Sequence, residues 1–165
     1  MAIEEVKSYF ENEGLLGRVR EFAVSSATVD LAAEAAGVIP ARIAKTLSFY
    51  GVNGAILVVA AGDAKVDSRK FKDAFMIKSK MLKQEDVLKL TGHPVGGVCP
   101  FLVPEDAKIY LDVSLKRFET VFPACGSDRS CVELNLVELY RHSKAEGWVD
   151  VCKCWAEEEE ISSVF

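Results

Sequence analysis

The part of this sequence best suited to chemistry is a glycine-rich loop whose main chain could bind an oxygen atom. Residues 91–101 read TGHPVGGVCPF, with three glycines, two prolines and few side chains long enough to do chemistry. Because Gly96 and Gly97 are adjacent, the main chain can approach a ligand closely, and the prolines restrict the backbone on both sides. Such a loop can direct N–H groups at the oxyanion of an acyl-transfer reaction. The alternative is an ordinary glycine- and proline-rich connection, which composition alone favours.

Lys45 is the second candidate, because its place in an apolar run is unusual for a lysine. It opens the run Lys45-Thr46-Leu47-Ser48-Phe49, and strict strand alternation places it on the same face as Leu47 and Phe49. A lysine on an apolar face must extend to solvent, form an ion pair or point into a cleft. The alternative is that the strand begins at Thr46 and Lys45 only caps its end.

A cysteine nucleophile is the third candidate, with Cys99 attacking and His93 acting as its base. The spacing permits this pair, but a cysteine directly before a proline in a tight loop is more often packed than reactive. The other histidine, His142, falls late in an amphipathic segment, where we expect a solvent-exposed helix face. The sequence has no Gly-x-Ser-x-Gly elbow, no Walker loop and no Gly-x-Gly-x-x-Gly motif.

The cysteines indicate reduced thiols rather than disulfides or a metal site. There are five cysteines in a chain that is long enough to fold without disulfide bonds, and an odd number leaves at least one unpaired. Cys152 and Cys154 are separated by one residue, whereas the spacer in zinc-binding pairs is usually about two to four residues. We therefore expect no metal and no cofactor, and a cytoplasmic location.

Charge and hydropathy exclude further classes of protein. The formal net charge is -5, from 20 basic and 25 acidic side chains, but four of the acids form the run 157–160. Removing these four leaves 21 acidic against 20 basic side chains, and a nearly neutral body does not suit a protein that coats DNA. The longest apolar run, residues 55–61, is too short to span a membrane. Residues 65–89 carry eight basic side chains that could contact phosphates, although such a run is more often a solvated helix face.

The elements that must position these residues are a mixture of helices and strands. Apolar periodicity predicts helices over residues 3–13, 28–36, 67–75, 84–90 and 135–142. Alternating or β-prone runs predict strands over residues 18–24, 45–50, 55–61, 109–113 and 132–136, and near 122 and 149. The two longest strands are joined by Gly-Val-Asn-Gly, which is typical of a hairpin. Because proline cannot donate to a strand ladder, we expect Phe122-Pro123 in an edge strand.

This order of elements lacks the regular βαβ alternation of a parallel sheet. It predicts the α+β class, with a single domain built around one sheet or a partial barrel. We expect the domain to occupy residues 1–156 and the remaining residues, 157–165, to form an acidic C-terminal tail.

Several of these segments together resemble a known family. Residues 28–37 (TVDLAAEAAG) followed by 43–47 (IAKTL) are similar to the opening block of the YbaK/EbsC family. Residues 92–101 are similar to its glycine loop, and 110–115 with 132–134 fit its later strands. The resemblance spans roughly residues 20–150 in the same order. It implies an α+β fold: a single compact domain with a mixed, partly barrel-like β-sheet flanked by helices.

The resemblance assigns roles to individual residues. Lys45 corresponds to the family's key lysine and would hold the aminoacyl-tRNA end, and Gly96 and Gly97 belong to the loop whose backbone amides face the substrate carbonyl. The resemblance also implies that four further residues in or beside these elements bind the substrate, namely Thr46, Ser48, His93 and Val98.

The implied activity is hydrolysis of the ester between a wrong amino acid and tRNA, because these proteins are free-standing relatives of the editing domain in bacterial prolyl-tRNA synthetases. We expect an aminoacyl-tRNA deacylase that acts in trans on the acceptor end of tRNA(Pro) carrying alanine or cysteine, with prolyl-tRNA synthetase as a candidate partner. The alternative is a non-catalytic module of the same fold that binds tRNA or a synthetase. Some members carry Ser-Gly-Gly-Lys-Arg-Gly where residues 124–129 read ACGSDR, so the substrate of the cysteine-specific members does not transfer to this chain.

Overall fold

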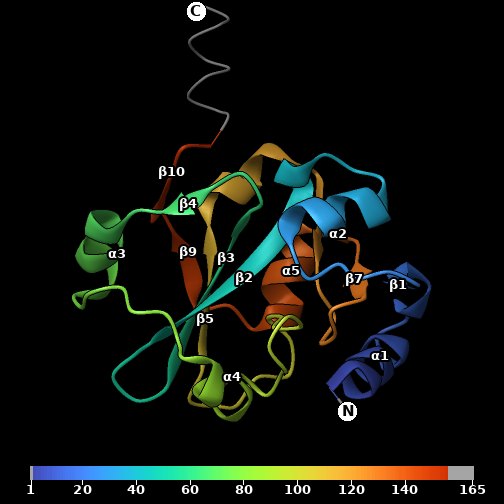
Figure 1. Cartoon of the computed structure of the whole chain (residues 1–165), viewed down its shortest axis with the longest axis horizontal. Helices are drawn as coiled ribbons and strands as arrows, with labels where there is room; N and C mark the ends of the chain where they lie inside the picture. The colour runs from blue at the N-terminus through green and yellow to red at the C-terminus, as the bar shows by residue number, and fades with distance from the viewer. Residues whose placement is uncertain (1, 156–165) are drawn as a thin grey trace, which may run out of the picture.

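A long antiparallel hairpin forms the centre of the fold. The computed structural model describes residues 2–155 (Figure 1). Within it β2 (Ile43–Tyr50) pairs with β3 (Ala55–Ala61) in a register that runs from Ala44 opposite Ala61 to Tyr50 opposite Ala55. The hairpin prediction is confirmed, and β2 begins two residues before Lys45. Lys45 is therefore an interior strand residue, which excludes the alternative that it only caps the strand.

Six strands form one mixed sheet around this hairpin, in the order β8-β6-β2-β3-β5-β9. The other four strands are β5 (Lys108–Asp112), β6 (Thr120–Pro123), β8 (Leu134–Asn135) and β9 (Gly147–Val149). β2 pairs in parallel with β6, as do β3 with β5 and β5 with β9, while β6 and β8 are antiparallel. The sheet curls into a half-barrel (Figure 1), so the predicted α+β fold with a partly barrel-like sheet is confirmed.

Two short strand pairs form separate two-stranded sheets. β1 (Val19–Glu21) pairs with β7 (Ser130–Val132), and β4 (Lys65–Val66) pairs with β10 (Cys152–Lys153), both antiparallel. The predicted strand over residues 18–24 is therefore shorter than expected. The predicted acidic tail lies outside the described residues, and its boundary stays a prediction.

The helices begin and end where the sequence provides capping residues. They are α1 (Ala2–Asn12), α2 (Val29–Ala36), α3 (Ser68–Phe75), α4 (Gln84–Thr91) and α5 (Leu136–Ser143), with 3₁₀ turns η1 (Leu16–Arg18), η2 (Pro40–Arg42) and η3 (Val113–Arg117). Thr28 accepts a hydrogen bond from the N–H of Leu31, and Gly37 ends α2 at a φ of 74°. α5 begins with the capping box of Asn135 and Glu138. Among residues 2–155, no helix is long and apolar enough to cross a membrane.

The core lies on both faces of the hairpin, and a smaller cluster supports α2. In β3, Leu57 and the four residues that follow are fully buried, as expected for a central strand covered on both sides. Ala33 and Ala36 of α2 pack with Ile43, Phe122 and Cys131 in a separate buried cluster. This second cluster holds α2 against β2 and β6. In Figure 1 α2 and α3 lie at opposite ends of the sheet.

Two expectations about the later strands are wrong. β6 lies between β2 and β8 rather than at the edge of the sheet. Its proline is tolerated because Pro123 ends the strand and is paired only with Ala44 of β2, whereas β8 pairs with Thr120 and Val121. The expected strand over 132–136 is divided into β7 and β8, and Leu136 already belongs to α5.

The expectation that His142 is solvated is also wrong. His142 is buried, its Nδ1 lies 2.9 Å from the hydroxyl of Tyr9, and its ring packs edge-on against that of Phe10. α1 covers the face of α5 that sequence periodicity alone would leave in water. Helix docking between distant segments cannot be recognised from one helix's pattern.

Candidate active site

A cavity of about 300 Å³ lies between α2, the start of β2 and the glycine loop. Its far wall is formed by the end of β6 and the segment that leads into β7. The apolar part of the lining includes Val29, Ala32, Ile43, Leu47 and Phe122, and the polar part includes Ser26, Thr28, Lys45, Thr46 and Ser130. No His, Asp or Glu from residues 2–155 lines this cavity. The site therefore offers hydroxyls, one ammonium group and main-chain groups, but no carboxylate or imidazole.

The structure brings four of the seven predicted site residues together here. Lys45 and Thr46 from β2 line the cavity, and Gly96 and Val98 line it from the glycine loop. The other three, Gly97, His93 and Ser48, are not part of the lining. Ser48 is buried further along β2, where its carbonyl accepts the N–H of Leu82.

The glycine loop has two main-chain N–H groups that lack a partner among the described residues, both in residues that line the cavity. The N–H of Gly97 donates to the carbonyl of Pro94 at 3.0 Å and closes a turn, with Gly96 at a φ of 86°. The N–H groups of Gly96 and Val98 have no hydrogen-bond acceptor among residues 2–155. Two N–H groups that lack an internal partner, in residues that line one cavity, could stabilise a negatively charged oxygen there.

Gly97 has a packing role that explains its residue type. A Cβ atom at this position would lie 2.7 Å from the Cα of Ser127 and 2.8 Å from its N. The loop and the turn over residues 124–129 therefore touch main chain to main chain, which only glycine allows. The turn is fixed in its place because Ser26 donates through both its N–H and its hydroxyl to the carbonyl of Asp128.

Lys45 extends along the cavity to the turn that follows β3. Its Nζ donates to the carbonyl of Gly62 at 3.3 Å and also to that of Ala64. Burial lowers the pKa of Lys45, while the nearby Cys152 and Asp63 act in the opposite direction and Lys65 lowers it further. An ammonium group has three N–H donors, so one donor is left for a ligand once the two carbonyls are engaged.

The hydroxyl of Thr46 is a second indication that the cavity accepts a polar ligand. Its Oγ1 is buried and has no hydrogen-bond partner among the described residues. A buried hydroxyl without a partner costs about 1–3 kcal/mol. Thr46 belongs to the cavity lining, and a substrate group that displaced the atoms covering this oxygen would remove that cost.

His93 and Cys99 form a buried pair outside the cavity. The ring Nε2 of His93 lies 2.6 Å from the carbonyl of Phe101 and 3.3 Å from the Sγ of Cys99. Burial raises the pKa of the Cys99 thiol to about 12 and lowers the pKa of His93. Cys99 is therefore a neutral, inaccessible thiol at neutral pH, and the hypothesis of a Cys99 nucleophile is wrong.

Sequence reasoning missed the serine hydroxyls of the cavity. Ser130 lies at the start of β7 with its Oγ 2.9 Å from that of Ser127 and accepts the N–H of Cys125 at 3.3 Å. Ser26 and Ser130 come from segments more than 100 positions apart. The cluster of Gly, Ser and Asp over residues 126–128 predicts a turn, but nothing local indicates that it faces the loop before α2.

Comparison with known proteins assigns this architecture to a family. The sequence profile described as "Aminoacyl-tRNA editing domain" matches residues 24–141, which include the cavity lining from Ser26 to Cys131. The chain belongs to this family. The resemblance drawn from the sequence is thereby confirmed.

Individual relatives agree with this assignment. The chain is 51% identical over 156 residues to the uncharacterized protein YwhH of Bacillus subtilis, covering 94% of this chain and 99% of that protein. It is 30% identical over 125 residues to proline–tRNA ligase of Thermotoga maritima, covering 75% of this chain but only 21% of the ligase. A solved structure of a proposed trans-editing enzyme for prolyl-tRNA synthetase superposes with a TM-score of 0.82 at 28% identity, over 92% of this chain and 97% of that one.

Proposed function

We propose that this protein is a trans-acting deacylase that hydrolyses the ester of mischarged tRNA, acting on tRNA(Pro) that carries alanine or cysteine. The observation that carries the proposal is the convergence of Lys45, Thr46 and the unpartnered amides of Gly96 and Val98 on one cavity. Membership of the editing family and the similarity to part of a proline–tRNA ligase support it.

The chemistry asks little of the protein, because an aminoacyl ester is already activated towards hydrolysis. The protein must hold the acyl carbonyl and stabilise the negative charge that develops on its oxygen. The N–H groups of Gly96 and Val98 would donate hydrogen bonds to that oxygen. Removing one such donor from an enzyme typically lowers kcat by about 10²–10³-fold.

Lys45 would hold the charged end of the substrate, either the terminal phosphate of the tRNA or the acyl oxygen, by a charge-assisted hydrogen bond. No imidazole or carboxylate from the described residues lines the cavity, so the attacking group is a water molecule or the adjacent ribose hydroxyl. Cys131 also lines the cavity, but burial raises the pKa of its thiol to about 11. It is therefore neutral at the pH of the reaction.

The apolar walls favour a small side chain on the substrate. Val29 and Ala32 of α2 line the cavity together with Ile43 and Phe122, and they pack against the buried cluster that holds α2 in place. A synthetase pocket sized for proline cannot strongly reject a smaller amino acid, since one missing methylene is worth only about 1–3 kcal/mol. A second, smaller pocket that accepts alanine or cysteine and excludes proline would correct the error.

The proposal implies particular partners. The substrate is the acceptor end of an aminoacyl-tRNA, and prolyl-tRNA synthetase is the enzyme whose errors it would correct, so both would meet this protein in the cytoplasm. Neither a metal nor a cofactor has a role in the proposed reaction. Among residues 2–155, no group of three or more His, Cys, Asp or Glu side chains is arranged to hold a metal ion.

The test is a panel of tRNAs carrying different amino acids. We expect release of alanine or cysteine from tRNA(Pro), and no release of proline. A matched pair of lysine variants controls the assignment: Lys45→Ala should lower the rate at least tenfold, whereas Lys108→Ala, at an exposed ion pair with Glu146, should not. Binding of tRNA without hydrolysis of any ester would reject the proposal in favour of a non-catalytic binding module.

A further inference from the structure

The turn after β3 holds the ammonium group of Lys45 from two sides. Gly62 and Ala64, whose carbonyls accept from Nζ, directly flank Asp63. The turn is closed by the N–H of Ala64, which donates to the carbonyl of Ala61 at 3.0 Å. The orientation of Lys45, and thus the direction of its remaining N–H donor, depends on the position of this turn.

Asp63 could disturb that arrangement, because it is a carboxylate close to the ammonium group. Its charge already acts on Lys45 in the direction that raises the lysine's pKa. Yet the hydrogen bonds of Nζ go to the two neutral carbonyls. The carboxylate of Asp63 accepts two hydrogen bonds from the guanidinium of Arg117, with Nη1 2.9 Å from Oδ2 and Nη2 2.6 Å from Oδ1.

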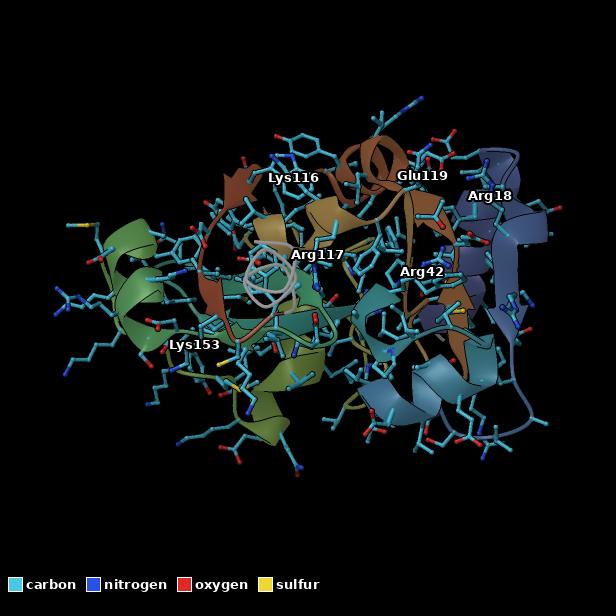
Figure 2. The ribbon with its side chains drawn as sticks, turned by 90° about the horizontal axis from the view of Figure 1, so that it is seen from above. Arg18, Arg42, Lys116, Arg117, Glu119 and Lys153 are labelled. Carbon is cyan, nitrogen blue, oxygen red and sulfur yellow. The ribbon has the colours of Figure 1, made fainter. Side chains whose placement is uncertain are left out.

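Arg117 is itself fixed, and its side chain is only 9% exposed. Its Nε donates to the carbonyl of Ser114 at 3.0 Å, and its guanidinium lies 4.9 Å from the ring centres of both Phe118 and Trp155. Ser114 in turn accepts the N–H of Ala61 at 3.1 Å. Figure 2 shows Arg117 near the middle of the face seen from above, with Lys116 above it and Lys153 to its lower left in this view.

We propose that Arg117 is a positioning residue for Lys45: it engages the carboxylate of Asp63 in a two-pronged ion pair, so that the turn presents carbonyls to the ammonium group and Lys45 is directed at the substrate rather than paired with Asp63. This inference rests on the proposed function of Lys45. Bidentate pairing is specific to a guanidinium, and a lysine in place of Arg117 could not reproduce it. Loss of Arg117 would remove this competing ion pair, so that the carboxylate would attract Lys45 more strongly and draw it away from the cavity.

A double-mutant comparison separates this role from a general effect on folding. Arg117→Ala should lower kcat/KM for the mischarged tRNA about tenfold or more, as expected for a misdirected charge-assisted hydrogen bond. Adding Asp63→Asn to that variant removes the competing carboxylate and should restore most of the rate. The kcat/KM of Arg117→Lys should lie between those of Arg117→Ala and the double variant. The kcat/KM of Lys116→Ala, at the neighbouring exposed position, should match that of the wild type.

The second readout does not require catalysis. NMR titration of the Lys45 ammonium group should show a higher pKa in Arg117→Ala than in the wild type, and a return towards the wild-type value in the double variant. An Asp63→Asn/Arg117→Ala protein that is as slow as Arg117→Ala, with an unchanged Lys45 pKa in both, would overturn the inference. If the wild type hydrolyses no ester, the proposed function fails, and the titration alone still decides the positioning role.

Discussion

Gly97→Ala tests whether the contact between two main chains holds the amides of the glycine loop in place. The new Cβ would lie 2.7, 2.8 and 2.9 Å from the Cα, N and C atoms of Ser127, whereas ordinary contact begins at 3.4 Å. These are backbone atoms that cannot rotate away, so the loop and the turn must separate by roughly 0.5–1 Å. A displacement of about 1 Å in a catalytic group can cost about 10²-fold in rate.

We therefore expect kcat to fall about a hundredfold in Gly97→Ala, with a smaller effect on folding. Overpacking of this kind costs about 1–3 kcal/mol, which corresponds to a Tm lower by about 2–12 °C for a domain of this size. The assay is single-turnover release of the amino acid from mischarged tRNA(Pro), run beside thermal unfolding followed by circular dichroism.

Two other glycines provide matched controls for this variant. At Gly147 in β9, a Cβ atom would have no neighbour within 4 Å, so Gly147→Ala should behave as the wild type. Gly96 has a φ of 86°, but its Cβ would meet nothing closer than 3.5 Å. Gly96→Ala should lose about 1–2 kcal/mol of stability from backbone strain and slow the reaction less than Gly97→Ala. Wild-type kcat in a folded Gly97→Ala protein would refute the reasoning.

Three further predictions follow from single residues. Burial lowers the pKa of Lys45 in the folded protein below 10.5, the value of an ordinary lysine. Between the lowered and the ordinary pKa the unfolded chain binds more protons than the folded one, so the free energy of unfolding rises with pH. Lys45→Met should lose this rise in urea denaturation, and wild-type kcat/KM should fall as pH rises through the lowered pKa. Cys99→Ala should keep full activity while losing about 1 kcal/mol of stability, and an inactive but folded variant would restore the nucleophile hypothesis. Thr46→Val should leave the free energy of unfolding unchanged or raise it by about 1 kcal/mol, but it should slow deacylation about fivefold to tenfold. The deacylation rate of Thr46→Ser should stay near that of the wild type. Equal rates for the wild type and both variants would remove Thr46 from the site.

Local signals explain why most of the fold could be predicted from the sequence. The hairpin of β2 and β3 follows from two β-prone runs around Asn53-Gly54, and α5 begins where Asn135 and Glu138 form a capping box. Each of these features depends on residues close together in the chain. The family resemblance supplied the overall shape of the sheet, which no local pattern specifies.

The errors arise where distant segments meet. His142 is buried because α1 covers α5, and β6 can lie between two strands despite Pro123 because β8 pairs only with the first half of β6. Neither fact is encoded within a few residues of the position concerned. Tertiary packing overrides local pattern in both cases.

The candidate site could be predicted only in part, because several of its residues act through partners in distant segments. Lys45 and the glycine loop were recognisable by type and spacing, but the amide of Gly97 is used within the loop while that of Val98 lines the cavity. Ser26, Ser130 and Arg117 carry no signal in the linear sequence, because their roles depend on partners in other segments. Side-chain and amide partners of this kind become visible only in three dimensions.

The most direct test of the account is the single-turnover rate of alanine release from Ala-tRNA(Pro), compared between the wild type, Lys45→Ala and a reaction without protein. We expect the wild type to release alanine well above the spontaneous rate, Lys45→Ala to be slower by about tenfold or more, and Pro-tRNA(Pro) to remain intact with either protein. Equal release by the wild type and Lys45→Ala, or release from Pro-tRNA(Pro) at the same rate, would contradict the central claim that Lys45 and this small cavity edit mischarged tRNA.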